Sequence, residues 1–307
     1  MKKIYCASCP GTGGELVQGM REDEREYLAS YCIGLYSKAY FVRRGSKEEV
    51  QCRCRGFVAR RKSSEMKRKV LELFGFKSLE VENYEVYLET DLPLAKGLAS
   101  STADIGATAG ACLAFLGEKP ETEELCRLAA KIEPTDASFF QNTVLFDPLK
   151  GEAVEEFGFL EGMKSLILVP DKSLDTGELR RQSDYFSKKR ECRKEVSGLF
   201  FELKKAFSDK NRKKVAECAM KSAIFNQRMV ETPRLYEIEE IVRFCGGYGL
   251  NISHSGTAVC LLLPSVMSEG KLLEDLRKEG ILRYYTSYYS VPVVKGGIME
   301  EEVSWIM

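Results

Sequence analysis

Histidine is almost absent from this chain, because His254 is the single one among 307 residues. A zinc site with two histidine ligands is therefore excluded. Net charge is absent as well, since 46 basic residues balance 46 acidic ones. Without an overall electric field the chain has no general attraction for a polyanion. We therefore expect neither nucleic acid nor a membrane surface as a partner.

Long apolar runs are also missing, and no stretch approaches the 18 residues that a membrane-spanning helix needs. The opening residues MKKIYCASCPGTGG contain two lysines but no apolar core long enough for a secretory signal. Eleven cysteines are present, among them the pairs Cys6/Cys9 and Cys52/Cys54. Neither pair has a matching partner at zinc-ribbon spacing. We expect reduced, structural thiols in a cytoplasmic protein.

An apolar fraction of 44% is enough for a large core, and the apolar pattern alternates between strand-like and helical. Residues 1–58 are strand-rich, with a break expected at the glycines of 11–14. Strands and helices then mix without strict alternation, which indicates an α+β protein in two halves, 1–158 and 159–307. Further strands are expected at 84–93, 143–157 (as a hairpin), 164–170, 258–264 and 283–297, and helices at 62–74, 103–116, 121–132, 177–208, 211–227, 233–245 and 267–279.

The stretch DLPLAKGLASSTADIGATAGA, at 91–111, joins a glycine turn to three hydroxyl residues and then to a run of small ones. Ser101 and Asp104 fit a relaxed capping box, so an ordinary capped helix is one interpretation. A glycine turn entering a helix also exposes N–H groups and the positive end of the helix dipole, which bind anions. Adjacent hydroxyls can donate to phosphate oxygens or ligate Mg²⁺. Because the chain contains no GxxxxGK[ST], a phosphate cradle here is not a Walker loop.

The segment PLAKGLASSTA resembles the second motif of the GHMP kinases (galactokinase, homoserine kinase, mevalonate kinase and relatives), usually P-x-x-x-G-L-G-S-S-A-A. It departs from that motif at Ala99, where glycine is usual, and at Thr102, where alanine is usual. With CPGTGGELVQG near the N-terminus and IEPTDASFFQ downstream, the chain is most similar to the L-threonine kinases of cobalamin biosynthesis.

This resemblance implies a fold, a reaction and a cofactor. The fold would be a ribosomal-S5-domain-2-like N-terminal domain over 1–158 and a ferredoxin-like C-terminal domain over 159–307, with the active site between them. The reaction would transfer a phosphoryl group from ATP, with Mg²⁺, to the hydroxyl of L-threonine. The product, O-phospho-L-threonine, would feed the aminopropanol linker of adenosylcobalamin. Homoserine as substrate, or a non-catalytic ATP- or metabolite-binding regulator, are the alternatives. The oligomeric state is left open.

The resemblance also implies roles for individual residues. Ser101 and Glu133 would ligate Mg²⁺, with Glu123 or Glu124 as alternatives to Glu133, and Asp136 would act on the substrate hydroxyl. ATP would contact Pro93, Lys96, Gly97, Leu98, Ala99, Ser100, Ser101, Thr102 and Ala103. Candidate substrate contacts are Thr12, Gly14 and Glu15 in the first motif, and Ser255, Gly256 and Thr257 in the place of the third.

Each of these features also has a plain structural interpretation. The residues 10–15 could form a tight turn between strands, and Glu133 and Asp136 could be solvated acids at a helix end. His254 is more typical of a structural hydrogen-bonding residue than of a catalyst. The basic runs 53–69 and 188–194 are interpreted as solvated helix faces rather than as a nucleic-acid surface.

Overall fold

The computed structural model describes residues 3–45, 60–171, 181, 183–253 and 257–301. Within these residues ten strands form one sheet in the order β10-β1-β7-β8-β6-β9-β2-β4-β5, with β3 beside β2 and a further pairing of β1 with β2. The elements are β1 (Tyr5–Met20), β2 (Glu26–Arg43), α2 (Arg61–Leu73), α3 (Ser78–Val81), β3 (Tyr84–Thr90), α4 (Ser100–Leu116), α5 (Thr122–Ala130), β4 (Thr143–Asp147), β5 (Glu152–Gly158), β6 (Met163–Val169), α7 (Tyr185–Glu191), α8 (Arg193–Ser208), α9 (Arg212–Asn226), α10 (Leu235–Phe244), β7 (Gly249–Ile252), β8 (Val259–Pro264), α11 (Gly270–Lys278), η1 (Ile281–Arg283), β9 (Ser287–Val294) and β10 (Met299–Glu301).

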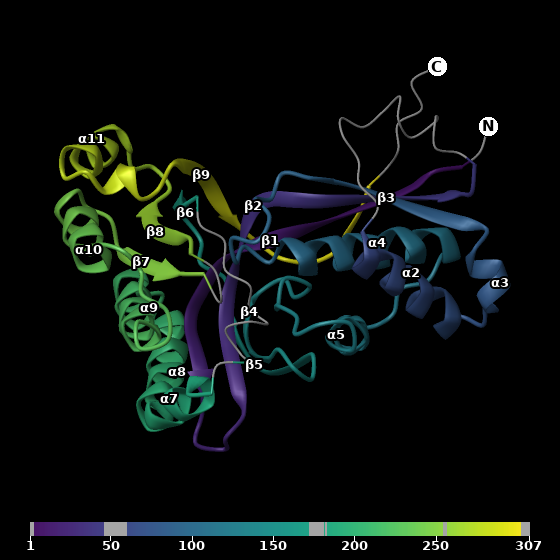
Figure 1. Cartoon of the computed structure of the whole chain (residues 1–307), viewed down its shortest axis with the longest axis horizontal. Helices are drawn as coiled ribbons and strands as arrows, with labels where there is room; N and C mark the ends of the chain where they lie inside the picture. Colours follow the sequence, from purple (N-terminus) through teal and green to yellow (C-terminus); the bar gives the residue numbers. More distant parts are fainter. Residues whose placement is uncertain (1–2, 46–59, 172–180, 182, 254–256, 302–307) are drawn as a thin grey trace.

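The long strands β1 and β2 run through the middle of the molecule (Figure 1). Helices α2 to α5 lie on one side of them, and α7 to α11 lie on the other. The sheet is continuous across residue 158, because β2 pairs with β9 and β9 pairs with β6. One buried hydrophobic cluster likewise draws residues from both halves, while two others belong to one half each. The α+β class is confirmed, and the division into two domains at residue 158 stays a prediction.

The glycine cluster at 11–14 does not end β1, so the break expected there is wrong. The strand continues, and its pairing with β2 shifts register between Pro10 and Val17. Bulges of this kind bend a strand without ending it. At Gly14 the φ angle is +80°, and a Cβ would lie 2.7 Å from the carbonyl oxygen of Ile252. Glycine here lets the bent part of β1 approach the end of β7.

Helix α4 is buried along most of its length, which explains its run of small residues. Twelve of its residues are buried, from Thr102 to Leu113. A Cβ at Gly106 would lie 2.5 Å from the ring of Phe139 and 2.7 Å from the sulfur of Cys9. Small side chains therefore allow the helix to pack closely against β1. The helix expected at 103–116 is confirmed, and it begins three residues earlier, at Ser100.

The C-terminal half differs from the expectation at several points, among them the short strand β10 and the later start of β9 at Ser287. The long helix expected at 177–208 is divided at Cys192 into α7 and α8, and part of its first turns lies outside the described residues. Strand β7 was not expected, and its four residues are all buried. The helices at 212–226, 235–244 and 270–278 match their expected ranges to within three residues.

The interpretation of the basic runs as solvated faces is wrong for two of their lysines, Lys67 and Lys189. Lys67 is 9% exposed, and its ammonium donates to the carbonyl oxygens of Val81 and Tyr84. Lys189 forms an ion pair of 3.0 Å with Glu26, and both side chains are only 5% exposed. Tertiary contacts hold these charges, so periodicity and composition could not identify them. Residues 53–59 of the first run lie outside the described residues.

The cysteines agree with the expectation of structural thiols. The nine that the structure describes form no disulfide, and all except Cys245 are buried. Across the described ranges no group of three or more histidine, cysteine, aspartate or glutamate residues is arranged to hold a metal ion by itself. Burial raises the pKa of Cys9 to about 12, which makes its thiolate scarce at neutral pH. Of the described helices, none is both long and apolar enough to cross a bilayer.

Candidate active site

The loop before α4 is held in an unusual backbone conformation. The φ angles of Ala95, Gly97 and Ala99 are +55°, +77° and +54°. For the two alanines this left-handed conformation costs about 1–2 kcal/mol each. Ala99 is the N-cap of α4 and provides no side-chain cap. Strain of this kind gathers at functional sites, and the first N–H groups of α4 stay available for a ligand.

The capping box considered for Ser101 and Asp104 is not formed. Asp104 is 2% exposed and accepts hydrogen bonds from the Ser37 hydroxyl and the Arg60 guanidinium. Burial raises the pKa of Asp104 above its ordinary value, while Ser37 and Arg60 oppose that shift. Because Arg60 directly precedes α2, this contact fixes the start of α2 beside the start of α4.

A cavity of about 470 Å³ lies between the first turns of α2 and α4. Its volume falls in the range of small-molecule sites. Three consecutive basic residues from the start of α2 face it, which suits a polyanionic ligand such as a polyphosphate. The lining residues are Arg60, Arg61, Lys62, Ser63, Glu65, Ser101, Asp104 and Ile132.

Ser101 and Glu133 meet at the edge of this cavity, as the resemblance implied for the metal ligands. The Ser101 hydroxyl donates to one carboxylate oxygen of Glu133, and the ammonium of Lys62 contacts the other. Lys62 also donates to the Ser101 hydroxyl at 3.2 Å. Glu123 and Glu124 lie in the first turn of α5, and the described contacts include none between them and Ser101. The geometry therefore favours Glu133 over these two alternatives.

Asp136 lies where the first motif, the second motif and the EPTD block converge. Its carboxylate accepts hydrogen bonds from the Thr12 hydroxyl at 3.2 Å, from the Ser30 hydroxyl and from the Ala137 N–H at 2.6 Å. Its own N–H donates to the Thr102 hydroxyl at 3.2 Å. Thr102, a departure from the usual alanine, thus supports the backbone of Asp136. The carboxylate is fixed by contacts from three separate segments.

The protonation of Asp136 is set by two opposing effects. The side chain is nearly inaccessible, at 7% exposure, and burial raises its pKa above the ordinary value. The hydrogen bonds from Ser30, Ala137 and Thr12 favour the charged form and oppose that rise. The interpretation of Asp136 as a solvated helix-end acid is therefore wrong.

Glu15 is a second buried acid in this region. It is 1% exposed and is paired across the β1–β2 ladder with Ser30. Burial raises the pKa of Glu15 well above its usual range, and the neighbouring charge of Asp136 raises it further. The tight-turn interpretation of residues 10–15 does not hold, because they are part of β1. Thr12 also contacts the second motif, since its N–H donates to the carbonyl oxygen of Leu98 at 3.1 Å.

The other predicted site residues include Lys96 of the second motif and Thr257 in the place of the third. The ammonium of Lys96 donates to the carbonyl oxygens of Pro170 and Asp171, at 2.7 and 2.9 Å, beyond the end of β6. The Ser253 hydroxyl donates to the carbonyl oxygen of Lys96. Thr257 lies in the connection between β7 and β8, whereas Ser255, Gly256 and His254 lie outside the described residues.

Ser30 and Lys62 touch the site but were not predicted from the sequence. Ser30 is a buried hydroxyl inside the apolar stretch of β2, and an isolated polar residue in such a stretch is a signal that could have identified it. Lys62 is one of many basic residues in the run 53–69, and its ion pair with Glu133 depends on the packing of α2 against α4. The contact of Lys62 therefore has no sequence pattern of its own.

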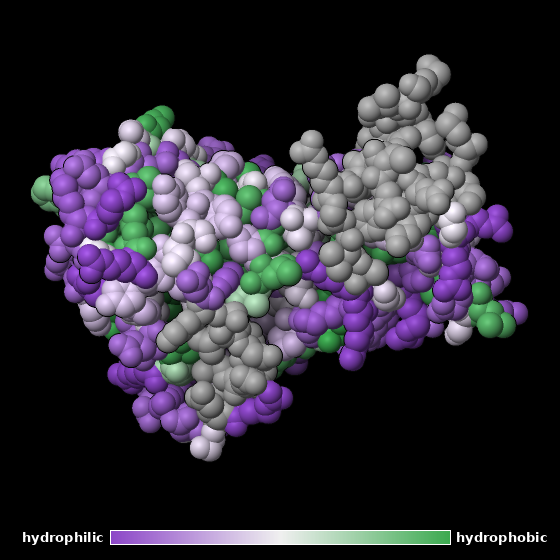
Figure 2. Space-filling view, turned by 45° about the horizontal axis from the view of Figure 1, so that its top comes forward, coloured by the Kyte–Doolittle hydropathy of each residue, from purple (hydrophilic) through white to green (hydrophobic). Residues whose placement is uncertain are grey.

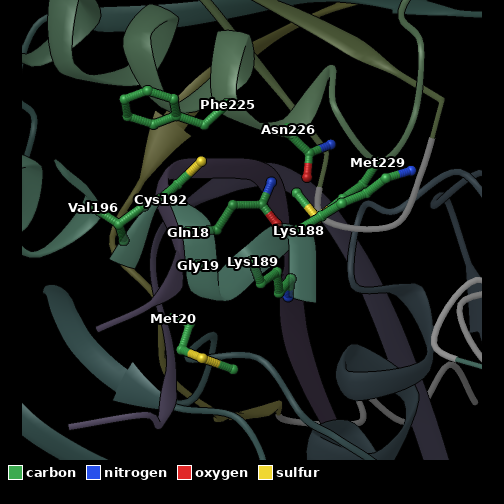
Figure 3. A pocket seen from close by; sticks show the side chains of 10 residues that line it. All are labelled: Gln18, Gly19, Met20, Lys188, Lys189, Cys192, Val196, Phe225, Asn226 and Met229. Carbon is green, nitrogen blue, oxygen red and sulfur yellow. The ribbon is translucent and has the colours of Figure 1, made fainter. Parts of the chain in front are cut away.

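A second, much smaller cavity lies against the far end of β1 (Figure 3). Gln18, Gly19 and Met20 line it together with residues of α7, α8 and α9, including Cys192 and Asn226. Its volume of about 10 Å³ gives room for roughly one water molecule. This cavity is too small for a nucleotide or an amino acid.

A further cavity of about 450 Å³ lies between the ends of α2 and α5 and the turn after β4, and of the described candidate site residues only Glu124 lines it. The cavity at α2 and α4 is the candidate ligand site because Ser101 lines it.

The chain is similar in sequence to proteins of known function. Residues 63–141 match the family model of the GHMP kinases N terminal domain. An L-threonine kinase of Citrobacter freundii is 30% identical over 262 residues, which cover 84% of this chain and 85% of that protein. An L-threonine kinase of Salmonella typhimurium is 28% identical over 301 residues, covering 96% of this chain and 95% of that protein.

The fold is similar to that of solved kinases. The crystal structure of homoserine kinase from Cytophaga hutchinsonii superimposes with a TM-score of 0.70, covering 98% of each chain at 16% identity. An identity of 16% supports similarity of the fold alone. The sequence match to the Citrobacter freundii enzyme is higher, at 30%, and extends over most of both chains. The chain is therefore a member of the GHMP kinase family.

Proposed function

We propose that this protein transfers the γ-phosphoryl group of ATP to the side-chain hydroxyl of L-threonine, with O-phospho-L-threonine and ADP as products. The observation that carries the proposal is the position of Asp136, which is buried at the convergence of the three motif segments. Similarity to two L-threonine kinases over most of the chain supports the choice of substrate.

We place the triphosphate in the cavity at the start of α4, where the uncapped N–H groups and the basic residues of α2 favour an anion. Ser101 and Glu133 suit Mg²⁺, because a hydroxyl and a carboxylate are hard oxygen ligands. The position of the Lys62 ammonium beside these same oxygens supports a cation site here. Nucleotide phosphates and water would complete the coordination around these two ligands. The metal, when bound, would neutralise charge on the phosphates.

Asp136 would accept or orient the proton of the substrate hydroxyl. Phosphoryl transfer depends on positioning and on charge stabilisation, so a base held in one orientation is useful. The contacts from Ser30, Thr12 and the Ala137 N–H provide that orientation. A raised pKa also brings the carboxylate closer to the value at which general bases are effective.

Glu15 is our candidate for contact with the substrate ammonium group. Two buried acids close together repel one another, which is why Asp136 raises the pKa of Glu15. A positively charged ammonium would offset this repulsion, whereas a neutral alcohol would not. The site therefore favours an amino alcohol. The first-motif residues Thr12 and Gly14, and Thr257 beyond β7, remain proposed substrate contacts.

The test is a panel of alcohols incubated with the purified protein and Mg-ATP, with products identified by mass. The panel contains L-threonine, L-homoserine and 3-hydroxybutyrate, which lacks the ammonium group. We expect phosphorylated product from threonine and far less from 3-hydroxybutyrate. Product from homoserine but not from threonine would contradict the substrate assignment, and no product from any alcohol would contradict the kinase proposal.

We further propose that the product supplies the aminopropanol linker of adenosylcobalamin and that the protein acts in the cytoplasm. The similarity of the three motif segments to L-threonine kinases of that biosynthesis supports this role. A strain without the gene should lose cobalamin-dependent growth and regain it with added O-phospho-L-threonine. Failure of this supplement, where the intact gene does restore growth, would contradict the pathway assignment.

A further inference from the structure

Lys62 occupies a specific place in the site. Its ammonium contacts both the Ser101 hydroxyl and the Glu133 carboxylate, while Ser101 contacts the other oxygen of the same carboxylate. The Lys62 side chain is 48% exposed and that of Glu133 is 18% exposed, so the contact lies at the mouth of the cavity. One positive charge thus already faces both of the protein's proposed metal ligands.

This contact differs from an ordinary surface ion pair, which contributes little because both side chains are free to move. Lys62 follows Arg60 by two residues, and Arg60 is fixed to the buried carboxylate of Asp104 on α4. Asp104 in turn accepts a hydrogen bond from Ser37 of β2. The start of α2 is therefore anchored to α4, and the anchor brings Lys62 to the Ser101–Glu133 pair.

We propose that Lys62 is an internal counter-ion of the metal site, which competes with free divalent cations and yields its place when a metal–nucleotide complex binds. The proposal rests on the proposed ATP-dependent function. An ammonium and a divalent cation repel one another, so both cannot contact the same oxygens closely. A lysine has a flexible four-carbon stem, which lets its charge turn from Glu133 to a nearby phosphate.

The lining of the cavity provides a second place for the Lys62 ammonium, beside the phosphates of a bound nucleotide. Arg60, Arg61 and Lys62 all face the same space of about 470 Å³, into which the phosphates would enter. The ammonium would thus exchange a carboxylate partner for a phosphate partner. Binding of the nucleotide would thereby free Glu133 for the metal. By linkage, each ligand then raises the affinity of the other by the same factor.

Hydrophilic residues cover most of the face in Figure 2, and hydrophobic ones stand in small separate groups. The large exposed side chains Phe201, Phe244 and Val266 come from α8, α10 and the turn after β8. Nothing in the structure shows what would cover them.

The experiment measures Mn²⁺ binding to the full chain by electron paramagnetic resonance, first without nucleotide and then with AMP-PNP. Without nucleotide, Lys62→Met should bind Mn²⁺ about 10-fold more tightly than the unchanged protein. Lys62→Arg keeps a cation and should behave like the unchanged protein. Adding AMP-PNP should raise Mn²⁺ affinity less in Lys62→Met than in the unchanged protein.

Lys131→Met is the matched control, because Lys131 is exposed and lies two residues from Glu133. Its Mn²⁺ affinity should not change. Equal Mn²⁺ affinity of Lys62→Met and the unchanged protein, with circular dichroism showing that both are folded, would overturn the proposal. If Lys62→Met does not fold, Lys62→Gln is measured in its place, with the same expected results. The measurement needs no threonine, so failure of the substrate assignment would leave this result intact.

Discussion

Replacing Asp136 with asparagine separates the role of its charge from the role of its shape. The amide keeps an oxygen that can accept from Ser30 and from the Ala137 N–H, the two donors to the same carboxylate oxygen. The negative charge, which we propose receives the substrate proton, is removed. A general base contributes about 10²–10⁴-fold to the rate, so Asp136→Asn should reduce turnover by that factor.

The same substitution, Asp136→Asn, should not lower the free energy of unfolding. Because burial raises the pKa of Asp136 in the folded protein, the folded state holds this proton more tightly than the unfolded chain does. This tighter proton binding stabilises the folded protein. The stabilisation is complete below the pKa of the unfolded chain, about 4, and is lost as pH rises through the pKa of Asp136 in the folded protein. At pH 7 the charged carboxylate therefore carries a burial cost that asparagine lacks. The free energy of unfolding of Asp136→Asn should equal or exceed that of the unchanged protein.

Asp136→Ala provides the contrast. It removes the acceptor for Ser30 and for the Ala137 N–H, and each buried donor left unsatisfied costs about 1–3 kcal/mol. This variant should lose both turnover and stability. Turnover is measured by coupled ADP release, and the free energy of unfolding by urea titration at pH 5 and pH 7. Unchanged turnover in Asp136→Asn would refute the role of the carboxylate as base or orienting group.

Three further changes test other parts of the account. Ala99→Gly should raise the free energy of unfolding by about 1 kcal/mol in urea titration, because glycine adopts the left-handed conformation without strain; a loss of stability would contradict the strain argument. Glu133→Gln should raise the Mg²⁺ concentration for half-maximal activity, and an unchanged Mg²⁺ dependence would remove Glu133 from the metal site. Lys189→Met should lower the free energy of unfolding by about 3–5 kcal/mol, because it leaves the buried Glu26 without this cation; a loss below 1 kcal/mol would show that the pair is not effectively buried.

The sequence predicted the helices better than the long strands. A period of 3.6 residues is local, so α2 and α5 could be located from the chain itself, and α4 could be located from its length and alanine content. The continuity of β1 through its glycines depends on bulges, which form only against a paired strand. The division at Cys192 is likewise set by packing, since α7 and α8 lie either side of a buried cysteine.

The residues of the candidate site were likewise predicted where the signal is local in the chain and missed where it is not. Asp136, Ser101 and Glu133 were predicted because they belong to contiguous motifs, and the structure places Ser101 against Glu133. The partners of Asp136 come from residues 106 and 124 positions away in the chain, Ser30 and Thr12. Contacts over such separations follow from the sheet pairing of β1 with β2 and from the position of α4 on it. Thr12 carried a motif signal, whereas Ser30 had none beyond its polarity in an apolar strand.

If this site phosphorylates the hydroxyl of threonine, phosphorus NMR detects the product directly. Purified protein, Mg-ATP and L-threonine would be observed in one tube over time. A new phosphomonoester resonance, split by the single β-proton of threonine, should grow in step with ADP. Appearance of ADP with inorganic phosphate alone, or no consumption of ATP, would contradict phosphorylation of threonine at this site.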